Sequence, residues 1–259
     1  MLKKLIKHDL KYGVRMFAVL HIILIIGCLI ARFLVIDHLD FSAAPEEFAP
    51  VIALLIVVLT MLFSAISFGC CIMYAVRFYK NLFTDEGYIT WTLPASPLTQ
   101  LWAKILSASI WYVLDLTICF AAAWFLQSAL ERIKPDFQAA LGMSFSSFCG
   151  LVVFFSFVGI LSCVLFIYTS IAIGQLVPAH RIIVSIAVYF ILNLITQIIS
   201  IGVSIITSVF PDYVFSPAQT SFSEYFFQML LIGTCTTTVL AIAGYFITYR
   251  ILQRKVNLI

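Results

Sequence analysis

The sequence predicts an all-α, polytopic membrane protein with six transmembrane helices and an N-terminal interfacial elbow helix. Of its 259 residues, 63% are apolar and only 10% are charged, whereas a soluble domain has about 50% and about 25%. The mean hydropathy is +1.11, and apolar runs long enough to cross a bilayer recur along the chain. These observations exclude a soluble enzyme, a disordered chain and a nucleic-acid binder.

Six apolar runs reach the roughly 20 residues that a helix needs to cross the hydrocarbon core. The runs cover residues 17–36, 51–76, 104–130, 147–173, 182–208 and 225–249. Backbone groups in hydrocarbon need partners within the protein, and these runs lack the polar alternation of a barrel strand. We therefore expect six helices.

The basic residues predict the orientation of the chain. With six crossings, both termini and two loops share one side. That side would hold twelve of the fifteen Lys and Arg residues, and the other side only three: Arg32, Arg132 and Lys134. Because basic residues concentrate on the cytoplasmic side of a membrane, we expect both termini to be cytoplasmic.

The first 16 residues have an amphipathic pattern. Leu2, Leu5 and Leu10 recur at helical spacing, and Lys3 and Lys7 fall on the other side. The pattern predicts an elbow helix over residues 1–16 that lies on the inner leaflet, ahead of a six-helix domain at residues 17–259. A basic leader that only orients the first span fits the same residues.

The longest inner segment, residues 77–103, is the most informative part of the chain. Residues 84–87 predict a turn, in which Gly87 allows a positive φ. After it, Ser96 is expected to cap the third span and Pro97 to begin it. Between them, residues 88–93 are apolar and aromatic in a segment that should contact water. They indicate either a partner surface or rings resting among lipid headgroups.

The motifs of several kinds of chemistry are absent from the sequence. There is no phosphate-binding G-x-x-x-x-G-K-[ST] string and no H-E-x-x-H or G-x-S-x-G. The four histidines and seven cysteines show no ligand or pairing pattern. We therefore predict a chain that is not an enzyme and binds no metal or cofactor.

Asp115 is the one ionisable residue deep in a predicted span. A carboxylate at that depth costs a few kcal/mol, so it should face protein or water. It indicates either a substrate-path or proton-relay residue, or a hydrogen-bonded carboxyl that fixes helix packing against Tyr or Ser neighbours.

Two inner segments resemble those of ABC-2 type permeases of Gram-positive bacteria. The run RFYKNLFTDEGY at residues 77–88, followed by Thr90, Thr92, Leu93, Pro94 and Lys104, resembles the loop between helices two and three of that family. The run IGQL at residues 173–176, with His180 and Arg181, is similar to the family's inner hairpin between helices four and five. The resemblance extends to the layout of the whole chain.

The resemblance implies a permease in a bacterial cell membrane that pairs with an identical or homologous permease. ATP and Mg²⁺ would be bound by separate ATP-binding subunits, whose motion would reach the membrane through the loop at residues 77–103. The implied coupling residues are Tyr79, Lys80, Asp85, Glu86, Gly87 and Tyr88, with Gln175, His180 and Arg181 on the second hairpin.

The expected function is therefore ATP-driven export of a peptide or a hydrophobic small molecule. The chain lacks the sizeable extracellular domain of larger relatives, and the cargo does not follow from the sequence. Two alternatives stay open. One is a proton-coupled secondary transporter that uses Asp115, and the other is a membrane scaffold or sensor subunit that transports nothing.

Overall fold

The computed structural model describes residues 1–39, 45–127, 144–210 and 222–254, and this part of the chain is helical without strands. Its helices are α1 (Leu2–Ile30), α2 (Pro45–Phe83), α3 (Asp85–Thr92), α4 (Pro97–Gln127), α6 (Phe145–Gly174), α7 (Arg181–Ile206) and α9 (Phe222–Arg254). A π-helical turn, Ala31–Val35, and a 3-10 turn, Ile36–His38, prolong α1. All except α3 are long and apolar enough to span a membrane. The protein is an all-α, multi-pass membrane protein.

The six predicted spans correspond to these six long helices. The fourth and fifth predictions, residues 147–173 and 182–208, agree with α6 and α7 within two residues at each end. The third prediction begins at Lys104, whereas α4 begins at Pro97; its last residues, 128–130, lie outside the described part of the chain. Arg132 and Lys134 also lie outside it.

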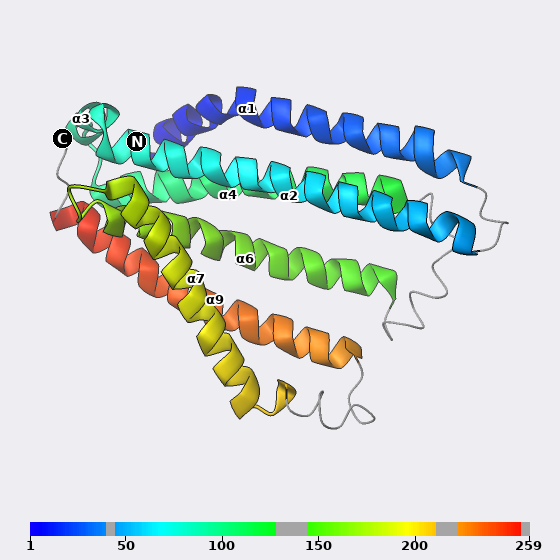
Figure 1. The fold of residues 1–259 in the computed structure, drawn as a ribbon. Helices are drawn as coiled ribbons and strands as arrows, with labels where there is room; N and C mark the ends of the chain where they lie inside the picture. Colours follow the sequence, from blue (N-terminus) through cyan, green and yellow to red (C-terminus); the bar gives the residue numbers. More distant parts are fainter. Residues whose placement is uncertain (40–44, 128–143, 211–221, 255–259) are drawn as a thin grey trace.

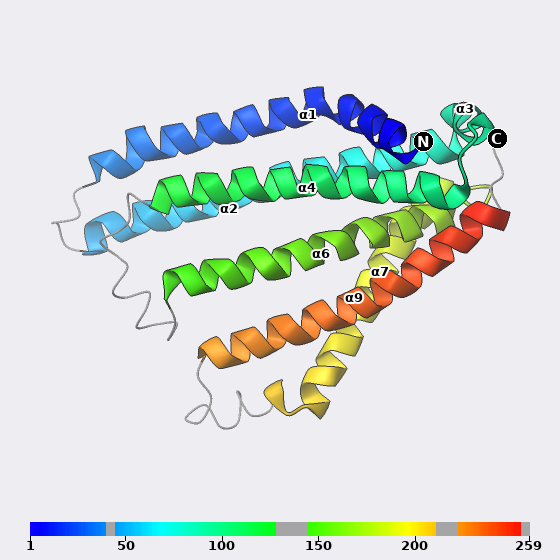
Figure 2. The same ribbon diagram turned by 180° about the vertical axis from the view of Figure 1, so that it is seen from behind.

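The long helices form a layered bundle. Helices α1, α2 and α4 run alongside one another, α6 lies between this group and α9, and α7 crosses α9 steeply (Figures 1 and 2). One end of the bundle brings together the start of α1, α3, the connection from α6 to α7 and the end of α9 (Figure 1). The described basic residues that predicted the orientation therefore lie near one end, as an even number of crossings requires.

The N-terminal amphipathic stretch continues directly into the first span. Residues 2–16 are the first turns of α1 and not a separate element. The predicted faces are nevertheless present, because Leu2, Leu5 and Leu10 are partly covered and Lys3 and Lys7 are exposed. Because the apolar side chains of residues 2–16 pack on the bundle, one helix includes both the amphipathic stretch and the first membrane span.

The chain turns at residues 84–87, where the Gly87 amide donates to the Thr84 carbonyl at 2.7 Å, but Gly87 does not adopt a positive φ. Thr84 is extended (φ −117°, ψ −166°) and ends α2, but Asp85 already begins α3, so Gly87 is helical. Two carboxylates in the first turn favour a new helix, because they face its positive dipole end. The predictions for Ser96 and Pro97 are confirmed: Pro97 begins α4, and the Ser96 hydroxyl accepts a hydrogen bond from the Thr99 amide at 3.2 Å.

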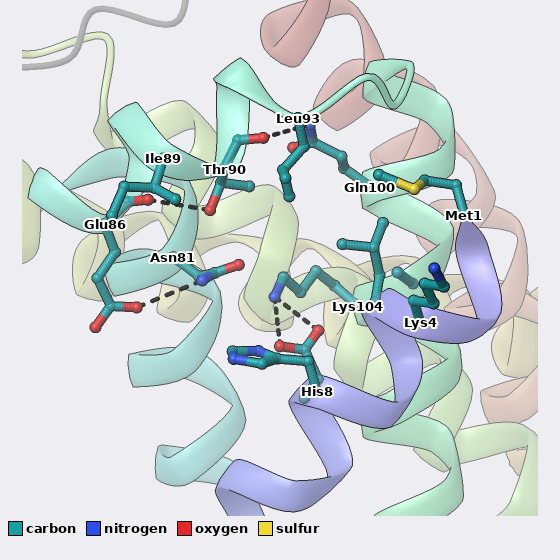
Figure 3. Close-up of a pocket in the computed structure, with 13 residues that line it drawn as sticks. Met1, Lys4, His8, Asn81, Glu86, Ile89, Thr90, Leu93, Gln100 and Lys104 are labelled. Carbon is teal, nitrogen blue, oxygen red and sulfur yellow. Dashed lines mark hydrogen bonds and ion pairs between the residues drawn. The ribbon is translucent and has the colours of Figure 1, made fainter.

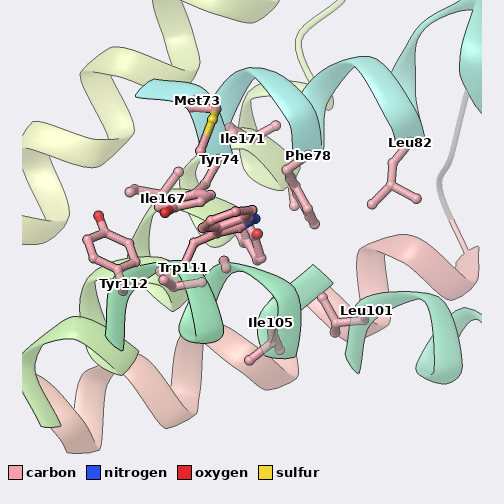
Figure 4. Close-up of a cluster of buried hydrophobic side chains, with 14 of the residues drawn as sticks. Met73, Tyr74, Phe78, Leu82, Leu101, Ile105, Trp111, Tyr112, Ile167 and Ile171 are labelled. Carbon is pink, nitrogen blue, oxygen red and sulfur yellow. The ribbon is translucent and has the colours of Figure 1, made fainter. Parts of the chain in front are cut away.

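The main hydrophobic core lies in the half of the bundle nearer α3. Phe78 of α2 stacks on Tyr168 of α6 with ring centroids 3.9 Å apart, and Trp111 and Tyr112 of α4 enter the same cluster (Figure 4). A smaller cluster around Leu24 joins α1, α2 and α4 farther along the bundle. This half is therefore a rigid base for α3.

Candidate functional site

Helix α3 is a short helix held across the end of the bundle. The Trp91 indole nitrogen donates a hydrogen bond to the Leu82 carbonyl at 3.0 Å, which ties α3 back to the last turn of α2. The Gln100 amide donates to the Thr90 carbonyl at 3.0 Å, which ties the end of α3 to α4. Helix α3 is therefore fixed at its carboxyl end from both neighbouring helices.

A buried ion pair connects the N-terminal helix with α4. The Lys104 ammonium donates to both carboxylate oxygens of Asp9, at 2.7 Å each. Their side chains are only 7% and 5% exposed, and the Lys104 carbonyl accepts a hydrogen bond from the Tyr168 hydroxyl. Removal of one partner would leave the other charge buried and uncompensated.

Arg77 extends this pair to α3. Its Nε donates to Asp9 at 3.3 Å, its Nη1 donates to Glu86 at 3.0 Å, and its Nη2 lies 3.2 Å from His8 Nδ1. The guanidinium also sits 4.1 Å from the centre of the Tyr12 ring. Arg77 therefore links α1, α2 and α3 through directional contacts, and we call Asp9, Arg77, Glu86 and Lys104 the charge network.

A cavity of about 450 Å³ opens beside the charge network, between the start of α1, α3 and the start of α4. Its walls carry Glu86 and Asn81, hydrogen-bonded to each other at 3.4 Å, and Lys104 (Figure 3). Gln100 lines it as well, and its buried Oε1 accepts no hydrogen bond within the described part of the chain. This space separates α1 from α3, so the two are joined mainly through Arg77.

The predicted coupling residues divide between the two faces of α3 and the end of α2. Asp85 and Tyr88 are exposed, Tyr88 by 53%, and Gly87 is buried against the bundle. The Glu86 side chain is 47% exposed and turns toward Arg77. At the end of α2, Tyr79 packs on the core and Lys80 is exposed.

Ile89 of α3 was not among the predicted coupling residues, but it is 71% exposed. Together with Asp85, Tyr88 and Thr92 it forms the exposed surface of α3, and we call these four residues the α3 face. Ile89 lies at the edge of this face and also lines the cavity beside the charge network. Ile89 and the adjacent Tyr88 form an exposed apolar patch on a helix beyond the core, and such patches mark interaction sites.

The second predicted hairpin is a tight connection from α6 to α7. The Gln175 amide is buried without a hydrogen-bond partner in the described residues, whereas His180 is exposed and precedes α7. Gly174 is required here, because a Cβ at this position would lie 2.8 Å from the Arg181 carbonyl oxygen and closer still to the Ser185 hydroxyl. This hairpin lies at the same end of the bundle as α3 (Figure 1).

Asp115 is buried in α4 and contacts two other helices. One carboxylate oxygen lies 2.8 Å from His21 Nε2 of α1, and the other accepts a hydrogen bond from the Ser67 hydroxyl of α2 at 2.9 Å. The Ser contact agrees with the interpretation of Asp115 as a carboxyl that fixes helix packing. The contact between His21 and Asp115 was not visible in the sequence, because these two residues are 94 positions apart.

Sequence reasoning missed Asp9, His21 and the role of Arg77. A signal for Asp9 was present, since it falls on the same helical face as Leu2, Leu5 and Gly13, and an acidic residue in an apolar stripe indicates a buried partner. His21 and Arg77 carry no such signal, because their partners depend on how the helices pack.

Comparison of the chain with protein-family models, with curated proteins and with solved structures gives no match. The fold and the site define only a class of protein. It is a multi-pass helical membrane protein with a short helix anchored across one end of the bundle.

Proposed function

We propose that the protein is the membrane subunit of an ATP-driven exporter, and that α3 receives the motion of a separate ATP-binding subunit. One observation carries the proposal: a short helix with an exposed isoleucine, tyrosine and carboxylate is anchored by buried contacts at the end of the bundle. A helix with exposed apolar side chains can bind a partner, and its hydrogen bonds to α2 and α4 can pass the partner's motion to the bundle.

The chemistry of the α3 face supports a protein partner. Ile89 and Tyr88 offer apolar area and a polar tip, which are common features of interface anchors. Asp85 offers a carboxylate that an Arg or Lys of the partner can engage. The ATP and Mg²⁺ would be bound by that partner, because the sequence has no phosphate-binding loop.

The charge network supports α3 as a point of coupling. A displacement of Glu86 acts on Arg77, and through Asp9 it reaches Lys104 of α4 and the first turns of α1. Three spans therefore respond to one movement. The His180 hairpin at the same end offers a second contact for the partner or for a second permease of the same kind.

The proposal is tested by co-purification. The chain is expressed with each P-loop ATPase that the genes flanking its own encode, and any complex is isolated in detergent and in nanodiscs. Replacing Ile89 by Asp should reduce recovery of the ATPase subunit at least about tenfold, because a charge cannot be buried unpaired at an interface. Asp85→Ala should weaken binding less and show a smaller salt dependence.

Asp37→Ala is the matched control for Asp85→Ala. Asp37 is an exposed carboxylate in the 3-10 turn beyond α1, at the other end of the bundle. Equal recovery of the ATPase subunit with the Ile89→Asp chain and the unaltered chain, with ATP hydrolysis still stimulated, would exclude coupling through α3.

A further inference from the structure

Three side chains that bind transition metals converge in the middle of the α1, α2 and α4 layer. His21 Nε2, Cys70 Sγ and one carboxylate oxygen of Asp115 all lie within 4.8 Å of one another. All three residues are buried. Each comes from a different helix, so helix packing assembles this group, which we call the His21 cluster.

The orientation of the His21 ring is fixed by a second hydrogen bond. Its Nδ1 lies 2.8 Å from the Phe17 carbonyl oxygen, which can only accept, so Nδ1 carries a proton. Phe17 stacks on the ring with centroids 3.8 Å apart. Nε2 therefore faces Asp115, and at a separation of 2.8 Å a proton lies between these two atoms. Metal-binding histidines show the same arrangement, with the other ring nitrogen held by a backbone carbonyl.

The carboxylate is supported in a similar way. Ser67 donates to the oxygen of Asp115 that does not face His21, and Cys119, one turn along α4, lies with its sulfur 3.8 Å from the oxygen that does. The His21 cluster together with Cys119 therefore offers one nitrogen, one oxygen and two sulfur atoms. Zinc sites use such mixed sets in tetrahedral geometry, whereas Mg²⁺ and Ca²⁺ prefer oxygen alone.

We propose that His21, Cys70 and Asp115, with Cys119 as the fourth ligand, bind a transition-metal ion of the Zn²⁺ type within the membrane. Binding releases the thiol protons of the cysteines and the proton shared by His21 and Asp115. Bonds of 2.0–2.3 Å place tetrahedral ligands about 3.3–3.8 Å apart, so closure around the ion needs side-chain shifts on the order of 1 Å. The bound ion would join α1, α2 and α4.

The test uses the purified full-length chain in detergent, stripped with a chelator and loaded with Co²⁺ as an optical probe of the zinc site. We expect one ion per chain, with thiolate-to-cobalt absorption and the visible bands of tetrahedral Co²⁺, displaced by Zn²⁺. Cys70→Ser should remove about half of the thiolate absorption, because Cys119 remains as the second thiolate ligand, and it should weaken binding at least about 100-fold. Ser67→Ala, which keeps every ligand, should weaken binding about tenfold.

Cys235→Ser is the matched control, since Cys235 is an exposed cysteine of α9 away from the cluster. It should bind Co²⁺ like the unaltered chain. Zn²⁺ should also raise the Tm of the unaltered and Cys235→Ser chains, but not that of Cys70→Ser.

The unaltered chain is sufficient to overturn the proposal. Octahedral Co²⁺ spectra without thiolate absorption in this chain would do so whether or not a variant folds. Equal affinity in the Cys70→Ser and unaltered chains would do the same. Neither result bears on the ATPase partner, because no nucleotide or second subunit is present.

Discussion

At the residue scale, the chain holds buried charges where its helices meet. Asp9 accepts from Lys104 and from Arg77, and all three side chains are at most 10% exposed. A carboxylate in such a place is stabilised only by its partners. Asp9 is therefore the residue on which the charge network depends most.

Replacing Asp9 by Asn should lower the free energy of unfolding by about 3–5 kcal/mol, because Lys104 loses its hydrogen-bonding carboxylate while remaining buried. Adding Lys104→Met to Asp9→Asn should recover much of this loss. Equilibrium unfolding in mixed detergent micelles measures the free energy of unfolding of the single and the double variant. The exposed Asp85→Asn change should alter stability by no more than about 0.5 kcal/mol. A double variant as unstable as Asp9→Asn alone would contradict this account.

At the element scale, connections between helices depend on small residues and caps. Gly174 ends α6 where the start of α7 passes close to it. The Ser185 hydroxyl, one turn into α7, donates to the Arg181 carbonyl and occupies the space that a side chain at position 174 would need.

Gly174→Ala should destabilise the protein by about 1–3 kcal/mol, since backbone atoms of α7 must move to admit the methyl group. Gly159→Ala, also in α6, has open space at the corresponding position and should be neutral or slightly stabilising. Thermal unfolding of the two variants gives the comparison. A Tm for Gly174→Ala equal to that of Gly159→Ala would refute the steric explanation.

A second prediction at this scale concerns the start of α4. Ser96→Ala removes the hydroxyl that accepts from the Thr99 amide and should cost about 1 kcal/mol. Ser146→Ala, at an exposed serine just inside α6, removes no cap acceptor, because Ser144 supplies that cap. Hydrogen exchange at the first turn of α4 should be faster only in Ser96→Ala.

The elements show what the sequence could and could not predict. Hydrophobicity and length predicted the six long helices, because a span must satisfy its own backbone. Local signals also predicted Ser96 and Pro97. The same local rules failed at Gly87, where the two preceding carboxylates favour a helix. The contact of His21 with Asp115 was beyond prediction, since it depends on the rotation of α1 against α4.

At the scale of the whole molecule, the apolar surface and the charged end define how the protein sits in a membrane. Helix α7 exposes Ile183, Phe190 and Leu194, all by at least 60%, as a lipid-facing helix does. The basic residues of the described part of the chain cluster toward the α3 end, and the positive-inside rule predicts that this end faces the cytoplasm.

Single cysteines introduced at Ile89 and at Asp37 should therefore react on opposite sides of the membrane. In intact cells, a membrane-impermeant thiol reagent should label Asp37→Cys and leave Ile89→Cys unlabelled until the cells are opened. The chain with only its native cysteines gives the background. Labelling of Ile89→Cys from outside would reverse the orientation and remove the basis for a cytoplasmic ATPase at α3.

The length of α2 has a mechanical consequence. It is a helix of 39 residues whose internal proline, Pro50, lies in the second turn at the end far from α3. At 1.5 Å per residue it is about 58 Å long, roughly twice the hydrocarbon thickness. A stiff rod of that length behaves as a lever arm. A push that tilts it by about 5° about its α3 end swings its far tip by about 5 Å, a displacement comparable to one helical turn.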